Sequence, residues 1–389
     1  MGEKSAKLNW KAIMMVTGAF ISYTIGAGFA SGNEVLQFFG SWGFPQLLSA
    51  VFGGILYTVV FCVCLYIVGQ KVSFEKLSDS YSFFGGKILG NFFKGFVVIF
   101  ILGCYMLMFA GAGSLGTQFL GLPQWVGAIA LGVVTGVIVI GGLKTVENVL
   151  GWAGIVILGY LVIFGIVTLF NPGTDFSSSA GAAQAVADGK IWQANLFALP
   201  PLNAFPALAT LNGPFIEGLS YGGICLLTGY PFYLALGKNM SNRREAIIGG
   251  TVTAIGFYLC VAFVLVILMG NFFALVDPAT DKMFPFPTLA AITSIWPSGA
   301  WTYSIIIFIG IFTTATGYLW VLTDMVLPGQ ERSKKAMIFI GAMLLIGIAL
   351  GGVIPFSALI NFMFPFAGVI GMVMIVALII KTVQVVKQA

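Results

Sequence analysis

Runs of about twenty hydrophobic residues alternate with shorter polar segments along almost the whole chain. Runs of this length cross a bilayer as helices, and the chain contains ten of them. Five lie at about 11–40, 45–70, 90–119, 124–141 and 149–170, and five at about 212–239, 244–269, 296–324, 335–353 and 355–383. The pattern predicts an all-α integral membrane protein with a first five-helix repeat at 1–170 and a second at 212–389. Residues 171–211, rich in Gly, Ala, Ser, Asn and Pro, are predicted to connect the repeats outside the cell, with short surface helices.

Composition supports a membrane location. The 389 residues are 59% hydrophobic and 8% charged, whereas a soluble domain carries about 25% charged residues. The net charge of +5 comes from cations that form no basic, aromatic-interleaved face, so we expect no nucleic-acid partner. The five cysteines lie inside hydrophobic runs without metal or redox spacing, which indicates ordinary packing. The first run is too long for a cleavable signal, so we expect it to be retained as the first span.

The Lys and Arg residues fix an orientation, because loops on the cytoplasmic side carry an excess of them. Only Lys190 and Lys282 fall on the side opposite to all the others. We therefore expect a multi-pass protein of the cell membrane with both termini in the cytoplasm. Five is an odd number of spans, so the two halves enter the membrane from opposite faces, as an inverted repeat requires.

The first span is interrupted in its middle by Gly26-Ala27-Gly28-Phe29-Ala30-Ser31-Gly32-Asn33-Glu34. Each glycine weakens an α-helix by roughly 1 kcal/mol relative to alanine. Nonhelical backbone at this depth persists only where it faces protein or a polar cavity, because lipid cannot satisfy its N–H and C=O groups. The sequence therefore predicts a broken helix beside a cavity at the membrane midplane.

An inverted repeat predicts a second broken helix at the start of the second half. Span six offers the pair Gly222-Gly223 as the break, with Pro231 as a kink further on. Glu217 shortly precedes this break and Glu34 shortly follows the first one. Both carboxylates are expected in the external half of the membrane, near the mouth of the cavity.

The run from Gly26 to Glu34, followed by Val35-Leu36-Gln37-Phe38-Phe39, resembles the signature of the YkvI-like membrane proteins of the amino-acid/polyamine/organocation superfamily, which implies an amino-acid permease. The resemblance implies the LeuT-type fold of five plus five helices with broken helices 1 and 6. It also implies transport by alternating access, in which spans one, two, six and seven rock against spans three, four, eight and nine.

The same resemblance implies a sodium site. In sodium-coupled relatives, the ion lies between backbone carbonyls of the first span and hydroxyls of span eight. Carried onto this chain, the pattern nominates the carbonyls of Gly26, Phe29 and Gly310 and the hydroxyls of Thr313 and Thr314. Neutral oxygens suit a hard cation. The alternative is that these threonines bond back to their own helix, as is common in membrane helices. Proton coupling is the other option, although span five lacks the charged residue of proton-coupled relatives.

The substrate is expected beside the two breaks, where N–H groups at the start of a half-helix attract a carboxylate. The alternative for each candidate is ordinary packing, and Gly28 with Gly32 forms a Gly-xxx-Gly pair typical of close helix contact. The candidates come from spans one, three and six: Ala27, Gly28, Phe29, Ser31, Gly32, Asn33, Glu34, Tyr105, Met108, Glu217, Ser220, Tyr221, Gly222 and Gly223.

The leading functional hypothesis is a secondary transporter of a small amino acid or related zwitterion, coupled to Na⁺ as a symporter and without a covalent cofactor. The hydrophobic spans contain no Lys or Arg at the membrane depth of Glu34 and Glu217 that could pair with them. This keeps open a Na⁺- or proton-coupled transporter of an organic cation or amine, on which Phe29, Tyr105 and Tyr221 could stack. A channel or a transporter-like sensor is the alternative of another class. Without His or clustered carboxylates, an enzyme is not expected. The substrate and the oligomeric state stay open.

Overall fold

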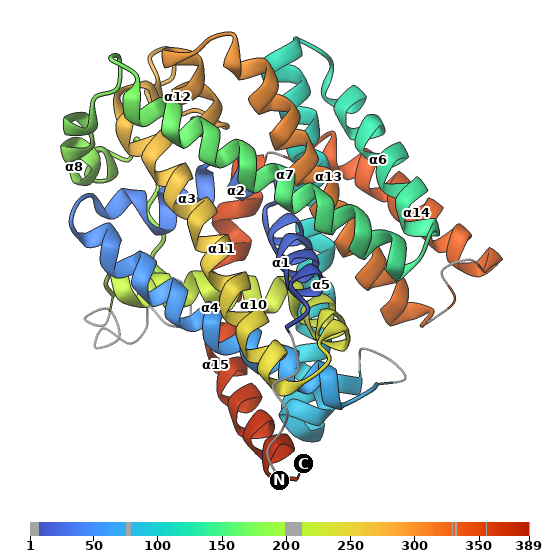
Figure 1. The fold of residues 1–389 in the computed structure, drawn as a ribbon. Helices are drawn as coiled ribbons and strands as arrows, with labels where there is room; N and C mark the ends of the chain where they lie inside the picture. The colour runs from blue at the N-terminus through green and yellow to red at the C-terminus, as the bar shows by residue number, and fades with distance from the viewer. Residues whose placement is uncertain are drawn as a thin grey trace.

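The computed structural model describes residues 8–74, 79–198, 212–328, 330, 333–354 and 356–388. It is a bundle of long α-helices (Figure 1). Within these residues, eight helices are long and apolar enough to cross a membrane. They are α4 (Gln46–Lys71), α5 (Asp79–Leu120), α7 (Leu143–Phe170), α10 (Pro214–Leu236), α11 (Arg243–Gly270), α13 (Gly299–Val326), α14 (Lys334–Gly351) and α15 (Phe356–Lys387).

Two further spans complete the ten predicted from the sequence. The helix α6 (Gln124–Ile140) is apolar but shorter. The first span consists of three pieces, α1 (Trp10–Thr24), α2 (Ala27–Ala30) and α3 (Asn33–Phe38), followed by the 3₁₀ turn η1 (Gly40–Trp42). The all-α membrane fold and the count of ten spans are therefore confirmed. The division at residues 170 and 212 into two repeats stays a prediction.

The first span is broken at two places. The first lies between α1 and α2, where the N–H of Gly26 bonds to the carbonyl of Thr24 instead of continuing the helix. The second lies at Gly32, whose φ of +82° is a left-handed conformation that favours glycine. The short helix α12 (Pro287–Ile295) supports this second break, because Thr288 bonds through its N–H to Ser31 O and through its hydroxyl to Ala30 O.

Span six corrects the prediction, because α10 is a continuous helix through Gly222 and Gly223. These two glycines serve close packing instead of unwinding. A Cβ on Gly222 would clash with the Tyr57 ring of α4, and one on Gly223 would lie 2.6 Å from the carbonyl oxygen of Gly368 on α15. The helix α10 packs against both α4 and α15. Since helices approach this closely only through small residues, paired glycines in a span do not by themselves indicate a break.

The connecting segment contains the short surface helices expected of it. They are η2 (Phe176–Gly181), α8 (Ala182–Ala187) and η3 (Leu196–Ala198), and residues 199–211 of the predicted segment lie outside the described part. A hairpin of β1 (Val276–Asp277) and β2 (Lys282–Met283) lies beside it, with η6 (Phe272–Ala274) just before. Lys190 forms an ion pair with Asp281 at 2.8 Å, and Lys282 Nζ donates to Gly189 O. These contacts tie the connecting segment to the hairpin.

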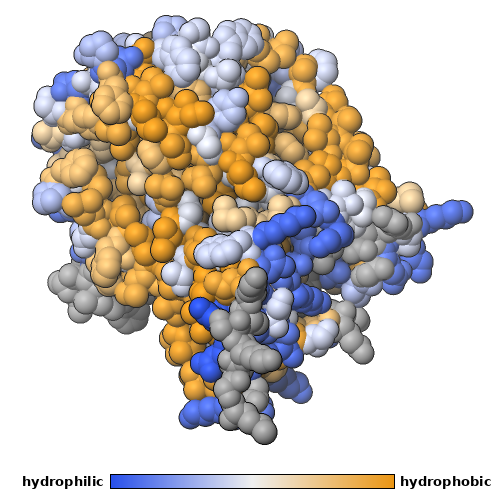
Figure 2. Space-filling model, viewed as in Figure 1, coloured by the Kyte–Doolittle hydropathy of each residue, from blue (hydrophilic) through white to orange (hydrophobic). Residues whose placement is uncertain are grey.

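The surface of the bundle suits a bilayer. Hydrophobic residues cover most of the face in Figure 2, and hydrophilic residues gather toward its lower right side. Large apolar side chains such as Phe52, Ile99, Val137 and Trp152 are more than half exposed. In water such a surface would be unfavourable, whereas lipid accommodates it.

Candidate functional site

A small cavity lies at the first break of span one. Its volume is about 20 Å³, which is large enough for one water molecule. A larger solute therefore enters only when the surrounding helices separate. The lining residues come from span one, α5, α10, α13 and α15: Thr24, Gly26, Glu34, Cys104, Met108, Tyr221, Ile224, Cys225, Thr228, Tyr318 and Phe364.

Glu34 places a carboxylate in this cavity. The residue belongs to α3, and its side chain folds back over α2, where a Cβ on Gly28 would overlap the carboxylate. The Tyr221 hydroxyl on α10 donates a hydrogen bond to Glu34 Oε2 at 3.2 Å. The Tyr221 ring is fixed by Phe38, Phe39 and Phe257, with ring centroids 5.0–6.4 Å away. Span one and α10 thus meet through a buried, oriented acid.

The opposite wall of the cavity contains sulfur. Cys104 and Met108 are one turn apart on α5, so both side chains reach the same face of this helix. The buried N–H of Ala27 at the start of α2 donates to Met108 Sδ at 3.3 Å. A thioether is a weak acceptor. The Ala27 N–H would therefore gain from a stronger acceptor, such as a carboxylate.

The predicted sodium ligands are only partly brought together. Thr313 donates to Ser22 O at 2.7 Å and Thr314 to Tyr23 O at 2.8 Å, so the threonine pair faces the last carbonyls of α1. The nominated carbonyls of Gly26 and Phe29 instead accept hydrogen bonds from the N–H groups of Ala30 and Gly32.

Gly310, the third nominated carbonyl, lies in the same region of α13. A Cβ there would be 2.8 Å from Ile25 O, which shows how closely α13 approaches the break. Thr313 also bonds back to the carbonyls of Ile309 and Gly310, as the alternative interpretation expected. The carbonyls of span one that face the threonines are therefore those of Ser22 and Tyr23, and not the predicted ones of Gly26 and Phe29.

Three of the predicted substrate residues line the cavity: Glu34, Met108 and Tyr221. The others have different surroundings, and their proposed role stays a prediction. Phe29 packs on Phe257, Tyr105 packs on Phe109, and Ser31 donates to Gly28 O. The Asn33 amide donates to Pro285 O, outside the cavity. The remaining ones that do not line it are Ala27, Gly28, Gly32, Glu217, Ser220, Gly222 and Gly223.

Glu217 is fully buried but lies away from the cavity lining. Its Oε1 accepts a hydrogen bond from the N–H of Leu196 at 2.7 Å, which ties the connecting segment to the first turn of α10. Glu217 therefore has a structural role, which the sequence did not indicate: it anchors the connecting segment to α10.

The cavity also contains residues that sequence reasoning missed. Ile224, Cys225 and Thr228 follow Tyr221 at spacings of three, four and seven, which is one face of a continuous helix. The spacing was visible in the sequence, but the assumed break at Gly222-Gly223 concealed it. Cys104 was equally visible, one turn before Met108. Thr24, Tyr318 and Phe364 had no local signal.

An aromatic layer closes the cavity on the side of the predicted cytoplasm. Tyr23 stacks on Phe232 with centroids 4.6 Å apart, and its hydroxyl donates to Thr228 O. Thr24 and Tyr233 share a hydrogen bond of 2.6 Å, and Tyr318 packs edge-on against Tyr23. We call Tyr23, Phe232, Tyr233 and Tyr318 the aromatic layer. It separates the cavity from the side that carries most of the cations.

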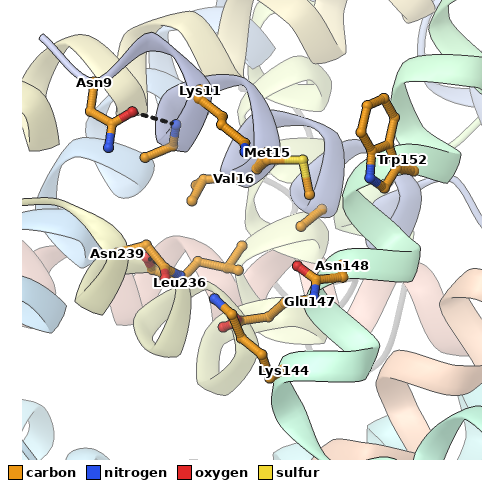
Figure 3. Close-up of a pocket in the computed structure, with 12 residues that line it drawn as sticks. Asn9, Lys11, Met15, Val16, Lys144, Glu147, Asn148, Trp152, Leu236 and Asn239 are labelled. Carbon is orange, nitrogen blue, oxygen red and sulfur yellow. Dashed lines mark hydrogen bonds and ion pairs between the residues drawn. The ribbon is translucent and has the colours of Figure 1, made fainter.

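Beyond the aromatic layer lies a wider hollow of about 600 Å³. Figure 3 shows it between the start of α1, the start of α7 and the end of α10 with η5 (Gly237–Asn239). Lys11 and Lys144 flank it, and Glu147 and Asn148 face it from α7. Lys144 and Glu147 are 3.8 Å apart. We call this hollow the inner vestibule.

Comparison with known proteins extends the resemblance beyond span one. No family model matches the chain. The uncharacterized membrane protein YkvI of Bacillus subtilis (strain 168) is 24% identical over 366 residues, which cover 93% of this chain and 94% of YkvI. The uncharacterized protein YyaD of the same organism is 30% identical over 130 residues, which cover 32% of this chain and 36% of YyaD.

Solved structures show the same architecture. MhsT in complex with L-phenylalanine has a TM-score of 0.62 at 16% identity, covering 99% of this chain and 98% of MhsT. Mhp1, a nucleobase-cation-symport-1 family transporter with bromovinylhydantoin bound, has a TM-score of 0.53 at 12% identity, covering 92% and 77%. A mutant manganese transporter of Eremococcus coleocola has a TM-score of 0.53 at 13% identity, covering 98% and 87%. The chain is therefore similar to YkvI over nearly its whole length and has the LeuT-type transporter fold.

Proposed function

We propose that the protein is a secondary active transporter that moves a small amino acid or related zwitterion by alternating access, with Na⁺ as the coupling ion. The observation that carries the proposal is the small cavity at the break of span one, which holds an oriented carboxylate and is bounded by helices from both halves of the chain. Binding sites of secondary transporters occur at such discontinuous helices near the bilayer midplane.

A carrier fits the barriers around the cavity better than a channel does. The aromatic layer separates the cavity from the inner vestibule. On the side away from the vestibule, the hydroxyls of Thr288 and Tyr303 donate to Ala30 O and so fix the backbone next to the second break at Gly32. A channel needs a continuous polar path in its conducting state. An enzyme is not supported either, because the named relatives are a membrane protein and transporters.

A zwitterion suits the polar groups of the site. Glu34 offers a negative charge in the cavity, and the N–H of Ala27, which follows the lining residue Gly26, offers a donor whose acceptor is the Met108 sulfur. Much of the remaining wall is hydrocarbon or sulfur and could hold a small side chain, and the Thr24 and Thr228 hydroxyls on it already donate to carbonyls of their own helices. MhsT, which has the same fold, was solved with L-phenylalanine, a zwitterion of this kind.

Sodium coupling is supported by the Thr313 and Thr314 hydroxyls beside the Ser22 and Tyr23 carbonyls. These four groups are neutral oxygens of the type that hard cations prefer. The ligand set proposed here therefore replaces Gly26 and Phe29 by Ser22 and Tyr23. Proton coupling through Glu34 is the second candidate, since a carboxylate in a closed cavity is a group that a proton can neutralise.

The direct test is counterflow in proteoliposomes loaded with a panel of unlabelled amino acids and amines. We expect saturable accumulation of the labelled solute, increased by an inward Na⁺ gradient. Current that grows linearly with solute concentration and shows no counterflow would indicate a channel. A panel without any counterflow would contradict the transporter proposal.

Native thiols provide a second prediction. Cys104 and Cys225 line the cavity, whereas Cys62 and Cys260 are buried elsewhere. In a variant that retains only Cys225, a saturating transported solute should slow modification by N-ethylmaleimide roughly tenfold, because the solute fills the space in front of the sulfur. A variant that retains only Cys260 is the control, and its rate should not change. Equal protection of both thiols would show a general tightening of the protein and not occupancy of this cavity.

A further inference from the structure

Glu34 is a carboxylate without a cationic partner. It is 7% exposed, and the ion pairs within the described residues join Lys144 to Glu147 and Lys190 to Asp281. None of the described cavity-lining residues is Lys or Arg. The titratable groups that face Glu34 are a thiol on α5, a phenol and a thiol on α10 and a phenol on α13: Cys104, Tyr221, Cys225 and Tyr318. None of them supplies a positive charge.

An unpaired charge of this kind is costly. Removing an ion from water costs several kcal/mol unless a partner and hydrogen bonds compensate for it. Inside a membrane protein, such a residue marks a pathway for a solute or an ion. The site lacks a positive charge, which a proton supplies while the site is empty and a cationic group of the solute supplies when it binds and replaces that proton.

The geometry leaves one carboxylate oxygen for such a group. Tyr221 donates to Oε2, whereas Oε1 receives no hydrogen bond from the described residues and lies over Gly28. The glycine is required here because a Cβ would overlap Oε1. Tyr221 thus fixes the direction of the carboxylate, and Gly28 makes room for it.

The cavity binds a carboxylate less strongly than an ammonium group, because the Ala27 N–H beside it is a single neutral donor that is already bonded to Met108 Sδ. Cys104, Met108, Ile224 and Phe364 present sulfur and hydrocarbon, which suit an apolar side chain. A carboxylate of the solute would also be repelled by Glu34 until an ammonium group had paired with it. Affinity should therefore depend on the amine much more than on the acid.

We propose that Glu34 binds the ammonium group of the transported solute, that Tyr221 positions Glu34, and that the protein accepts small apolar amines whether or not they carry a carboxylate. The inference rests on the proposed transport function and names the chemical feature that its site selects. Amino acids and their decarboxylated amines then share one site, and the corresponding carboxylic acids do not enter it.

The experiment compares matched compounds as competitors of counterflow by the wild-type protein. Each set contains an amino acid, its decarboxylated amine and its deaminated acid: alanine with ethylamine and propionate, leucine with isoamylamine and 4-methylpentanoate, and phenylalanine with phenethylamine and 3-phenylpropionate. In the set that competes best, the amine and the amino acid should inhibit within about tenfold of each other, while the acid should not inhibit. Inhibition by the acid but not by the amine would overturn the inference and leave the transport proposal intact, whereas absence of counterflow would overturn the transport proposal itself.

Three variants test which residues bind the ammonium group. Glu34→Gln should weaken amine binding roughly 30-fold or more, because it removes one side of a buried charge pair. Gly28→Ala should do the same without changing any charge, since its methyl group displaces the carboxylate. Tyr221→Phe keeps the ring packing and should raise KM severalfold with little change in the maximal rate, as expected of a positioning residue. Unchanged amine affinity in folded Glu34→Gln protein would disprove the role of Glu34.

A matched control is available in the inner vestibule. Glu147 is also nearly buried at 9% exposure, but it lies beyond the aromatic layer and beside Lys144. Glu147→Gln should leave the order of the matched compounds unchanged. Should Glu34→Gln fail to give a monodisperse protein in detergent, the wild-type comparison and Gly28→Ala still decide the question, because the atoms nearest to the added methyl group all belong to the Glu34 side chain.

Discussion

Replacing Gly154 with alanine is expected to destabilise the detergent-solubilised protein markedly, whereas the same change at Gly159 on the same helix is expected to have little effect. A Cβ on Gly154 would overlap the carbonyl group of Gly18 on α1, and one on Gly18 would overlap the carbonyl group of Gly151. The obstacle is backbone on both sides, so no side chain can move away. Overpacking of this kind costs roughly 1–3 kcal/mol, and the melting temperature should fall accordingly.

Gly159 is the matched control because nothing lies within 4 Å of the position that its Cβ would occupy. Alanine favours a helix over glycine by roughly 1 kcal/mol, so Gly159→Ala should be neutral or slightly stabilising. Scanning fluorimetry on both variants provides the measurement. Equal melting temperatures would show that α1 and α7 do not touch through Gly18 and Gly154, and would contradict the packing of span one described above.

Thr314→Ala should abolish most of the sodium stimulation of uptake. The Thr314 hydroxyl lies beside the carbonyls of Ser22 and Tyr23, and its removal takes one neutral oxygen from the proposed ion site. We expect the Na⁺ concentration for half-maximal uptake to rise about tenfold or more, which corresponds to roughly 1.4 kcal/mol. The measurement is the initial rate of uptake into proteoliposomes as a function of external Na⁺.

Thr314→Ser is the control, because it keeps the hydroxyl and removes only a methyl group. It should retain sodium stimulation close to that of the wild type. If Thr314→Ala together with Thr313→Ala leaves the stimulation intact, the sodium assignment is wrong. If the wild type shows no stimulation by Na⁺ with any transported solute, coupling through a proton at Glu34 becomes the better proposal.

Span one was readable from the sequence because its signal is local. Glycines, small polar residues and a carboxylate inside an apolar run conflict with an uninterrupted lipid-facing helix, whatever surrounds them. The structure places breaks at Gly26 and at Gly32, within the predicted stretch. The role of Glu34 was only half visible. The sequence indicated a functional role because no Lys or Arg is near Glu34 in the membrane. Only the folded structure showed that its carboxylate lies over Gly28 and accepts a hydrogen bond from Tyr221.

Span six was misread because the same residue type serves two purposes. Gly222 and Gly223 were interpreted as a break, but they allow α10 to approach α4 and α15 closely. Sequence alone cannot separate the two cases, since the difference lies in what faces the glycine. The error also hid Ile224, Cys225 and Thr228, whose spacing from Tyr221 depends on a continuous helix.

The sequence by itself determined the membrane location, the ten spans, the broken first span and the resemblance to YkvI-like proteins. The first three follow from local hydrophobicity and backbone propensity, and the resemblance follows from the residues of one short motif, so none of the four depends on tertiary contacts. The tertiary structure decided which polar groups share a cavity, because Glu34, Cys104, Tyr221 and Tyr318 come from four distant segments. It also decided that the carbonyls of Ser22 and Tyr23, and not those of Gly26 and Phe29, face the threonines of α13. The carbonyls that a broken helix leaves free depend on the hydrogen bonds that its backbone forms on either side of the break. The helices packed against the break determine those hydrogen bonds.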